Sequence, residues 1–80
     1  MKLGNKIKEF REARGGISQE GLAAVVGVSR QTIISIEKGK YVPNTLLSLK
    51  IAKFFDTKVE EVFYLVDDNK NRIRWRVKWE

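Results

Sequence analysis

The sequence predicts an all-α fold of five short helices followed by a short C-terminal β-strand. Apolar residues recur at helical spacing through most of the chain, and turn-forming residues separate the periodic segments at short intervals. After residue 66 the period changes to strict alternation, which is typical of a strand. Because 80 residues suit one domain, we divide the chain into a helical domain, 1–66, and a polar linker with a strand, 67–80.

Small polar residues and glycine bound the first three helices. A serine hydroxyl before a helix can accept hydrogen bonds from its free amide groups, and glycine after a helix allows the left-handed backbone that ends it. We expect these helices over about Asn5 to Arg14, from Ser18 to Gly27 and from Ser29 to Gly39.

The fourth helix follows Pro43, which breaks the preceding segment, and Asn44 can cap it. It is strongly apolar, with Leu47, Leu49, Ile51, Ala52, Phe54 and Phe55.

The fifth helix opens with the run Thr57-Lys58-Val59-Glu60, which fits a capping box. Its apolar face is predicted to consist of Val59, Val62, Phe63 and Val66.

The C-terminal segment begins with a wholly polar run, 67–71, and then alternates. Basic residues occupy one face from Arg72 to Lys78, and only a strand sorts residues in this way. The opposite face consists of Ile73, Trp75, Val77 and Trp79.

The composition argues against several classes of protein. The chain has no cysteine and no histidine, so it lacks a thiolate nucleophile, the usual general base, and the thiolate and imidazole ligands of most metal sites. We therefore expect no enzyme, metal ion, cofactor or small-molecule ligand. The longest apolar run, Leu22 to Val28, is too short for a membrane span, so a cytoplasmic protein is expected. A pI near 9.8 favours a polyanionic partner.

Residues 18–39 form the most specific pattern in the chain. Two short helices can cross steeply if the inner residue of the first is small, the turn accepts a left-handed backbone and the second supplies branched apolar residues. These demands are met by Ala23, Gly27, Ile33 and Ile36. The pattern resembles the helix-turn-helix of the lambda Cro and repressor type, a family of small transcriptional regulators. The resemblance covers about residues 7–66.

The resemblance implies that the third helix, about residues 29–38, reads base edges of double-stranded DNA in the major groove. Arginine can bind guanine bidentately, glutamine can do the same for adenine, and isoleucine can pack on a thymine methyl group. Arg30 could instead pair with a phosphate, and Ile34 could pack on the fourth helix. The implied base-reading residues are Ser29, Arg30, Gln31, Ile34 and Ser35.

Phosphate contacts are implied at both ends of the motif. Gln19 begins the second helix, where free amide groups and the helix dipole favour an anion. The lysines near the exit of the third helix could also be solvated side chains without a partner. The implied phosphate-contacting residues are Gln19, Thr32, Lys38, Lys40 and Tyr41.

Arg11 and Glu37 have a different predicted role. Each lies on a largely inward helix face, and an isolated buried charge is costly, so the two side chains should pair. We interpret them as a structural ion pair.

The strand needs a partner, because its backbone groups and its apolar face cannot be satisfied alone. The family also binds two-fold related half-sites as dimers. We favour a homodimer in which the tails, with Met1 to Leu3 as a possible further strand, form a sheet at the interface. Alternatives are a tail that wraps DNA or one that docks on another protein. The dimerisation residues would be Phe63, Val66, Ile73, Trp75, Val77 and Trp79.

These observations favour a sequence-specific DNA-binding transcriptional regulator, acting as a dimeric repressor. The alternatives are an antitoxin that regulates its own operon and a protein-interaction module that uses the C-terminal strand. Arg30 and Gln31 favour DNA binding, because a module without that role has no need of two adjacent base-reading side chains.

Overall fold

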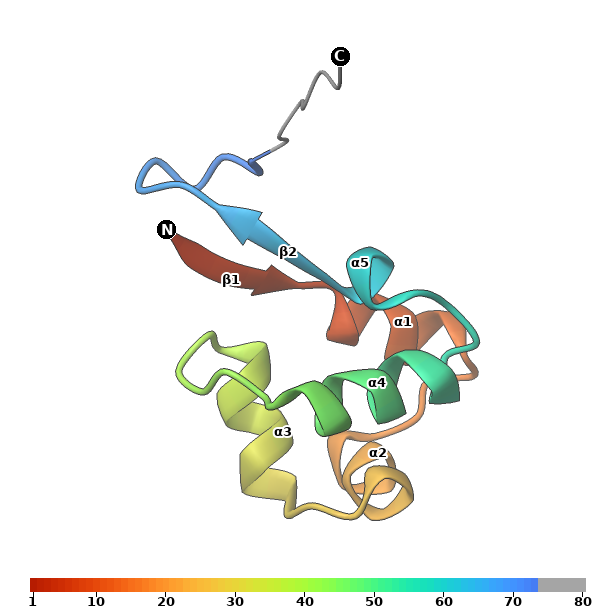
Figure 1. Cartoon of the computed structure of the whole chain (residues 1–80). Helices are drawn as coiled ribbons and strands as arrows, with labels where there is room; N and C mark the ends of the chain where they lie inside the picture. Colours follow the sequence, from red (N-terminus) through yellow and green to blue (C-terminus); the bar gives the residue numbers. More distant parts are fainter. Residues whose placement is uncertain (74–80) are drawn as a thin grey trace.

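Five helices and two strands make up residues 1–73, the part of the chain that the computed structural model describes (Figure 1). They are β1 (Lys2–Asn5), α1 (Ile7–Ala13), α2 (Gln19–Val26), α3 (Arg30–Glu37), α4 (Thr45–Phe54), α5 (Val59–Val62) and β2 (Phe63–Val66). The predicted five-helix fold is confirmed, with a two-stranded sheet added to it. No helix in this part of the chain is long and apolar enough to cross a membrane.

Three predicted helix caps are present. The side chains of Ser18, Ser29 and Asn44 accept hydrogen bonds from backbone N–H groups one turn into α2, α3 and α4. Gly27 ends α2 with a left-handed backbone at φ 77°, which a residue with a side chain adopts less readily. These local signals set the bounds of the two helices that cross in the helix-turn-helix.

Gly21 interrupts α2 with a residue that disfavours helices by about 1 kcal/mol relative to alanine. A Cβ atom at this position would lie 3.0 Å from Ile17 Cγ1 and 3.2 Å from Ser18 Oγ. Ser18 Oγ accepts the Gly21 N–H at 2.9 Å. The glycine therefore leaves room for the cap, which offsets its unfavourable helix propensity.

The core joins the helices to β2. Ala23, Ile33 and Ile36 are buried at the crossing of α2 and α3, as their spacing predicts. Phe10 and Phe55 stack with ring centroids 5.3 Å apart between α1 and the end of α4. The buried residues are Ile7, Leu22, Ala23, Val26, Ile33, Ile36, Leu47, Ile51, Ala52, Phe55, Val62 and Phe63.

The first helix begins at Ile7, two residues later than predicted. Asn5 belongs to β1 instead, and its side-chain amide links two elements. Asn5 Oδ1 accepts from Ile7 N–H at 3.2 Å, while Asn5 Nδ2 donates to Ile36 O at 3.0 Å. This residue therefore connects the sheet to the C-terminal end of α3.

The prediction for the fifth helix was wrong in two respects. Its N-cap is Lys58 rather than Thr57, and no side chain caps it. The Thr57 N–H, which a capping box would use, bonds to Ala52 O at 3.0 Å. The helix also ends at Val62, and Phe63–Val66 form β2. Aromatic and β-branched residues favour a strand, and β1 supplies the pairing that the periodicity of this segment did not reveal.

β1 and β2 pair antiparallel, so that the two ends of the domain lie side by side (Figure 1). Gly4 lies opposite Tyr64, whose ring covers the glycine. A Cβ atom at Gly4 would lie 2.8 Å from Tyr64 Cζ and would also collide with Cε2. The close approach of this ring therefore requires glycine at position 4.

Replacing Gly4 with alanine is expected to lower the free energy of unfolding by about 1–3 kcal/mol, because the methyl group displaces the Tyr64 ring. Urea denaturation of both proteins measures this loss. In a Tyr64→Ala background the same substitution should be nearly neutral. A full loss in that background would show that the ring contact is not the cause.

The polar run predicted to be a linker forms a turn that returns the chain along β2. Asp67 N–H donates to Asn71 O at 2.9 Å, and Arg72 then forms an antiparallel bridge with Val66. The short polar residues of this segment suit a turn because their side chains bond to nearby backbone groups. The remaining residues of the predicted strand lie outside the described part of the chain, including Trp75, Val77 and Trp79.

Candidate nucleic-acid interface

The N-terminal half of α3 presents polar side chains to solvent. Ile33 and Ile36 face the core, so Arg30 and Gln31 are exposed on the other side of the helix. Ile34 and Ser35 are half-buried, and Ser29 is exposed at the cap. The helix therefore carries all five candidate base-reading residues along or beside its outer face.

One hollow of 340 Å³ lies between α3 and the loop that follows it. Within it, Gln31 Nε2 donates to Ser35 Oγ at 3.4 Å, and the hydroxyl groups of Ser29 and Thr32 are 2.9 Å apart. The Thr32 hydroxyl thus takes part in the cap. The lining residues are Ser29, Gln31, Thr32, Ser35, Lys40 and Tyr41.

A second hollow of 520 Å³ lies on the other flank of α3, towards α1 and the start of α2. It brings Gln19, Ile34 and Lys38 together, although they come from different parts of the motif. Lys8 of α1 also lines it, and sequence reasoning missed this residue. Its position three residues before Arg11, on the same helix face, was the available signal.

Arg11 and Glu37 form the ion pair that their inward positions predict. Arg11 Nε and Nη2 donate to the two Glu37 carboxylate oxygens at 2.8 and 3.1 Å, and the side chains are 13% and 11% exposed. Arg11 Nη1 donates to Ile17 O at 3.1 Å, and Gln19 Nε2 donates to Glu37 Oε1 at 3.3 Å. This network ties α1, the start of α2 and the end of α3 together.

The charges around α3 are predominantly positive. Lys8, Lys38 and Lys40 flank the helix, and Arg30 is exposed at its first turn. Glu37 is the carboxylate within the second hollow, and its charge is balanced by Arg11. An anion approaching this face therefore meets cations on both flanks of the helix.

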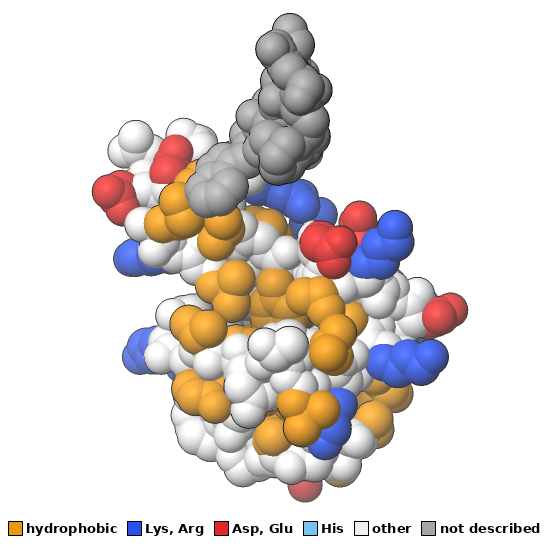
Figure 2. Space-filling view, viewed as in Figure 1, with side chains coloured by type: hydrophobic (Ala, Val, Ile, Leu, Met, Phe, Trp, Pro, Cys, Tyr) orange, Lys and Arg blue, Asp and Glu red, His pale blue; other side chains and the backbone are white. Residues whose placement is uncertain are grey.

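The residues assigned to dimerisation differ in their surroundings. Phe63 is only 7% exposed and belongs to the core, whereas Val66 and Ile73 are half-buried on the hairpin. Leu46 and Leu49 of α4 are 63% and 53% exposed, although the sequence pattern marked this helix as strongly apolar. Figure 2 shows hydrophobic side chains gathered around a hollow on this face of the molecule. Apolar surface of this kind marks contact sites in small proteins.

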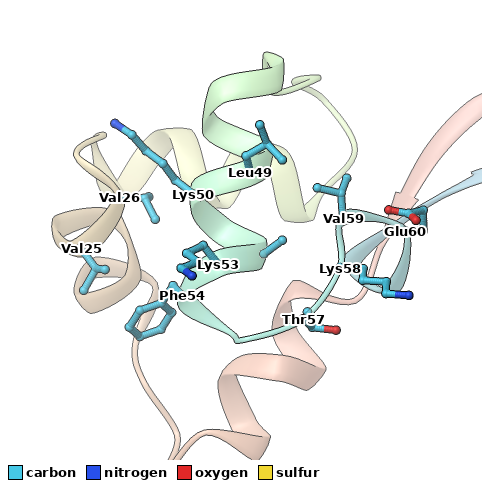
Figure 3. Close-up of a pocket in the computed structure, with 11 residues that line it drawn as sticks. Val25, Val26, Leu49, Lys50, Lys53, Phe54, Thr57, Lys58, Val59 and Glu60 are labelled. Carbon is cyan, nitrogen blue, oxygen red and sulfur yellow. The ribbon is translucent and has the colours of Figure 1, made fainter.

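An apolar groove of 940 Å³ runs between α2, α4 and α5 (Figure 3). Val25, Leu49, Phe54 and Val59 supply its apolar wall. Lys50, Lys53, Lys58 and Glu60 supply charged groups at its margins. Phe54 and Phe55 were named together as apolar residues of the fourth helix. Of these two residues, Phe55 is fully buried, whereas Phe54 is exposed and its ring packs edge-on against that of Phe55 with centroids 5.2 Å apart.

The short helices α2 and α3 cross each other and are joined through Gly27, which has a left-handed backbone. Cations flank the outer face of α3. Together these features define a helix-turn-helix domain. A family model described as helix-turn-helix matches residues 7–62. The chain belongs to this family of transcriptional regulators, and the resemblance to the lambda Cro and repressor type is confirmed.

Relatives from bacteria and archaea share most of their length with the chain. It is 58% identical to the HTH-type transcriptional regulator YgzD of Bacillus subtilis over 65 residues, which are 81% of this chain and 97% of that protein. It is 56% identical to the HTH-type transcriptional regulator MJ0272 of Methanocaldococcus jannaschii over 64 residues, 80% and 96% of the two chains.

A solved structure has a similar fold. The restriction-modification controller protein C.AhdI from Aeromonas hydrophila superimposes with a TM-score of 0.62 at 33% sequence identity. The match covers 69% of this chain and 78% of that chain.

Proposed function

We propose that the protein is a sequence-specific DNA-binding repressor that reads the major groove with α3. The observation that carries this proposal is the exposed pair Arg30 and Gln31 at the start of a helix flanked by two polar hollows. Both side chains can bond bidentately to base edges, and an α-helix fits the major groove. Ser29, Ile34 and Ser35 complete the base-reading face.

The two hollows would receive the phosphate groups on either side of the groove. Lys40, Tyr41 and Thr32 lie in one hollow, and Gln19 and Lys38 lie in the other. Lys8 joins the second set. Phosphate contacts fix the orientation of a protein on the duplex, while base contacts select the sequence.

We also propose that the repressor acts as a homodimer, with one α3 in each half-site. The apolar side chains Leu46, Leu49 and Leu65 support an assembly surface on the described domain. The alternating face of the tail would extend it, from Ile73 through Trp75 and Val77 to Trp79. Val66 is half-buried on β2, whereas the burial of Phe63 argues for a supporting role in the core. A relative 32% identical to the chain is named a phage transcriptional repressor, RstR of Vibrio cholerae, which supports repression.

Gln31→Ala is expected to weaken operator binding by about 1–3 kcal/mol and to relax the preference at one base pair of each half-site. Lys40→Ala should instead weaken binding to every sequence alike, with a shallower dependence on salt. The operator would first be selected from a random DNA pool. Affinity for it and for a scrambled duplex then measures both effects.

The pair of variants provides its own control, because both positions line the same hollow. Equal losses on operator and scrambled DNA for Gln31→Ala would exclude its role in readout. Failure of the random pool to yield any preferred sequence would overturn the proposed function itself.

A further inference from the structure

The apolar groove between α2, α4 and α5 takes no part in the proposed DNA interface. Among the described residues that line its 940 Å³, none belongs to the base-reading or phosphate-contacting sets. Its apolar side chains are Val25 of α2, Leu49 and Phe54 of α4, and Val59 of α5 (Figure 3). The groove is therefore a separate surface whose role DNA binding does not explain.

The wall of the groove is exposed apolar surface rather than the inside of a cavity. Val25 and Phe54 are 55% and 36% exposed, and Leu49 is exposed as well. A small ligand needs a site that buries most of its surface, whereas an amphipathic helix needs a groove for one face only. The shape therefore suits a helix better than a small molecule.

Lysines surround this apolar wall. Lys50 and Lys53 lie one turn apart on α4, and Lys58 directly precedes α5. Glu60 is the acidic residue among the described lining residues. Neither of the two ion pairs found within residues 1–73 includes a lysine of the groove. The margin therefore carries a net positive charge that an acidic partner would neutralise.

We propose that the groove binds an amphipathic α-helix of a partner protein, with acidic side chains on the borders of its apolar stripe. Apolar residues spaced three and four apart would contact Val25, Phe54 and Val59. Carboxylates beside that stripe would lie near Lys50 and Lys53. The proposal goes beyond DNA binding and does not rest on it.

Other occupants complement the charge of the groove less well. A two-fold contact centred on it would bring the lysines of one protomer against those of its partner, and like charges oppose association. Leu49 also belongs to the proposed dimer surface, but Leu46 and Leu65 do not line the groove. Residues 74–80 carry three cationic side chains and one acidic one, so their charge does not favour this site either.

Two designed helical peptides of about 18 residues provide the probe. They share one leucine stripe, which is flanked by glutamates in the first peptide and by lysines in the second. Fluorescence anisotropy of each labelled peptide, titrated with the full chain, should show binding of the glutamate peptide at least about 10-fold tighter than that of the lysine peptide. Equal affinities, or binding of neither peptide, would overturn the proposal. Binding of dodecanoate but of neither peptide would assign the groove to a small amphipathic anion instead.

Lys50→Glu with Lys53→Glu should reverse this preference, so that the lysine peptide binds the variant more tightly by about 10-fold. Lys2→Glu with Lys70→Glu is the matched control, because it makes the same change in net charge at exposed positions outside the groove. The control should keep the preference of the unmodified chain. An equal reversal in the control would show that net charge alone attracts the peptide, and would overturn the proposal.

Val25→Ser tests the apolar wall and should weaken binding of the glutamate peptide about 5-fold or more. Val42→Ser is its matched control, since Val42 is 68% exposed and does not line the groove. This control should leave the affinity unchanged. Equal affinities of the two variants would contradict an apolar contact at Val25.

Backbone amide NMR of the labelled full chain locates the bound peptide. Chemical shifts around Val25, Lys53 and Val59 should change when the glutamate peptide is added. Changes confined to α3 would show that the acidic peptide occupies the proposed DNA surface, and would overturn the proposal. Shifts at the same groove residues that depend on protein concentration without any peptide would overturn it in favour of a second copy of the chain.

Discussion

Glu37→Ala is expected to lower the free energy of unfolding by about 3–5 kcal/mol, because the substitution leaves the Arg11 guanidinium buried without a counter-charge. The loss also removes the acceptor of Gln19 and loosens the link between α2 and the end of α3. For a domain of this size, such a change is a large part of the total stability. Urea denaturation followed by circular dichroism measures it.

The double variant Arg11→Met with Glu37→Leu is the matched control. Removing both charges together should cost much less than removing Glu37 alone, because no buried charge then remains unpaired. A loss below about 1 kcal/mol for Glu37→Ala would show that water solvates Arg11 effectively. The ion pair would then be dispensable for the fold.

Trp75→Ala with Trp79→Ala is expected to convert the proposed dimer into monomers and to lower operator affinity about 100-fold or more. Each indole buries about 200 Å² in an assembled sheet, which corresponds to about 5 kcal/mol of apolar burial. A dimer with two recognition helices also binds two adjacent half-sites far more tightly than a monomer binds one half-site. Analytical ultracentrifugation and operator titration measure the two effects.

Arg74→Ser with Arg76→Ser tests the other face of the same segment and should leave the dimer intact. Operator affinity should fall in this variant only if the arginines contact phosphate, with a shallower salt dependence as the signature. The role of the tail in dimerisation would be contradicted if a chain ending at Asp68 stayed fully dimeric at micromolar concentration. The exposed leucines of α4, Leu46 and Leu49, would then be sufficient for assembly.

The helix-turn-helix was predictable because its signals are local. A serine or asparagine cap acts on amide groups within one turn, and Gly27 acts on its own backbone. The inward faces of α1 and α3 likewise predicted that Arg11 and Glu37 would meet. A helix cap finds its hydrogen-bond partner among neighbouring residues in the sequence. The partner of Arg11 could be identified because Glu37 has the opposite charge on an inward helix face.

The sheet was harder to predict because its partners are far apart in the chain. Phe63–Val66 continue the apolar period of α5, and only pairing with Lys2–Asn5 makes them a strand. The sequence around Gly4 does not show that glycine is required there, because the requirement comes from the ring of Tyr64, which is distant in the chain. Lys8 was not predicted as part of the candidate interface, because the hollow that it lines is formed by three helices that are separate in the sequence.

The contact between Gln31 and Ser35 has a consequence for the thermodynamics of recognition. Gln31 Nε2 carries two hydrogens, so one can remain on Ser35 while the other donates to adenine N7 and Oε1 accepts from N6. A glutamine that is already held in one rotamer loses less conformational entropy when it meets a base. Ser35 would thus contribute to affinity by narrowing the freedom of its neighbour in the unbound protein, whether or not it touches DNA.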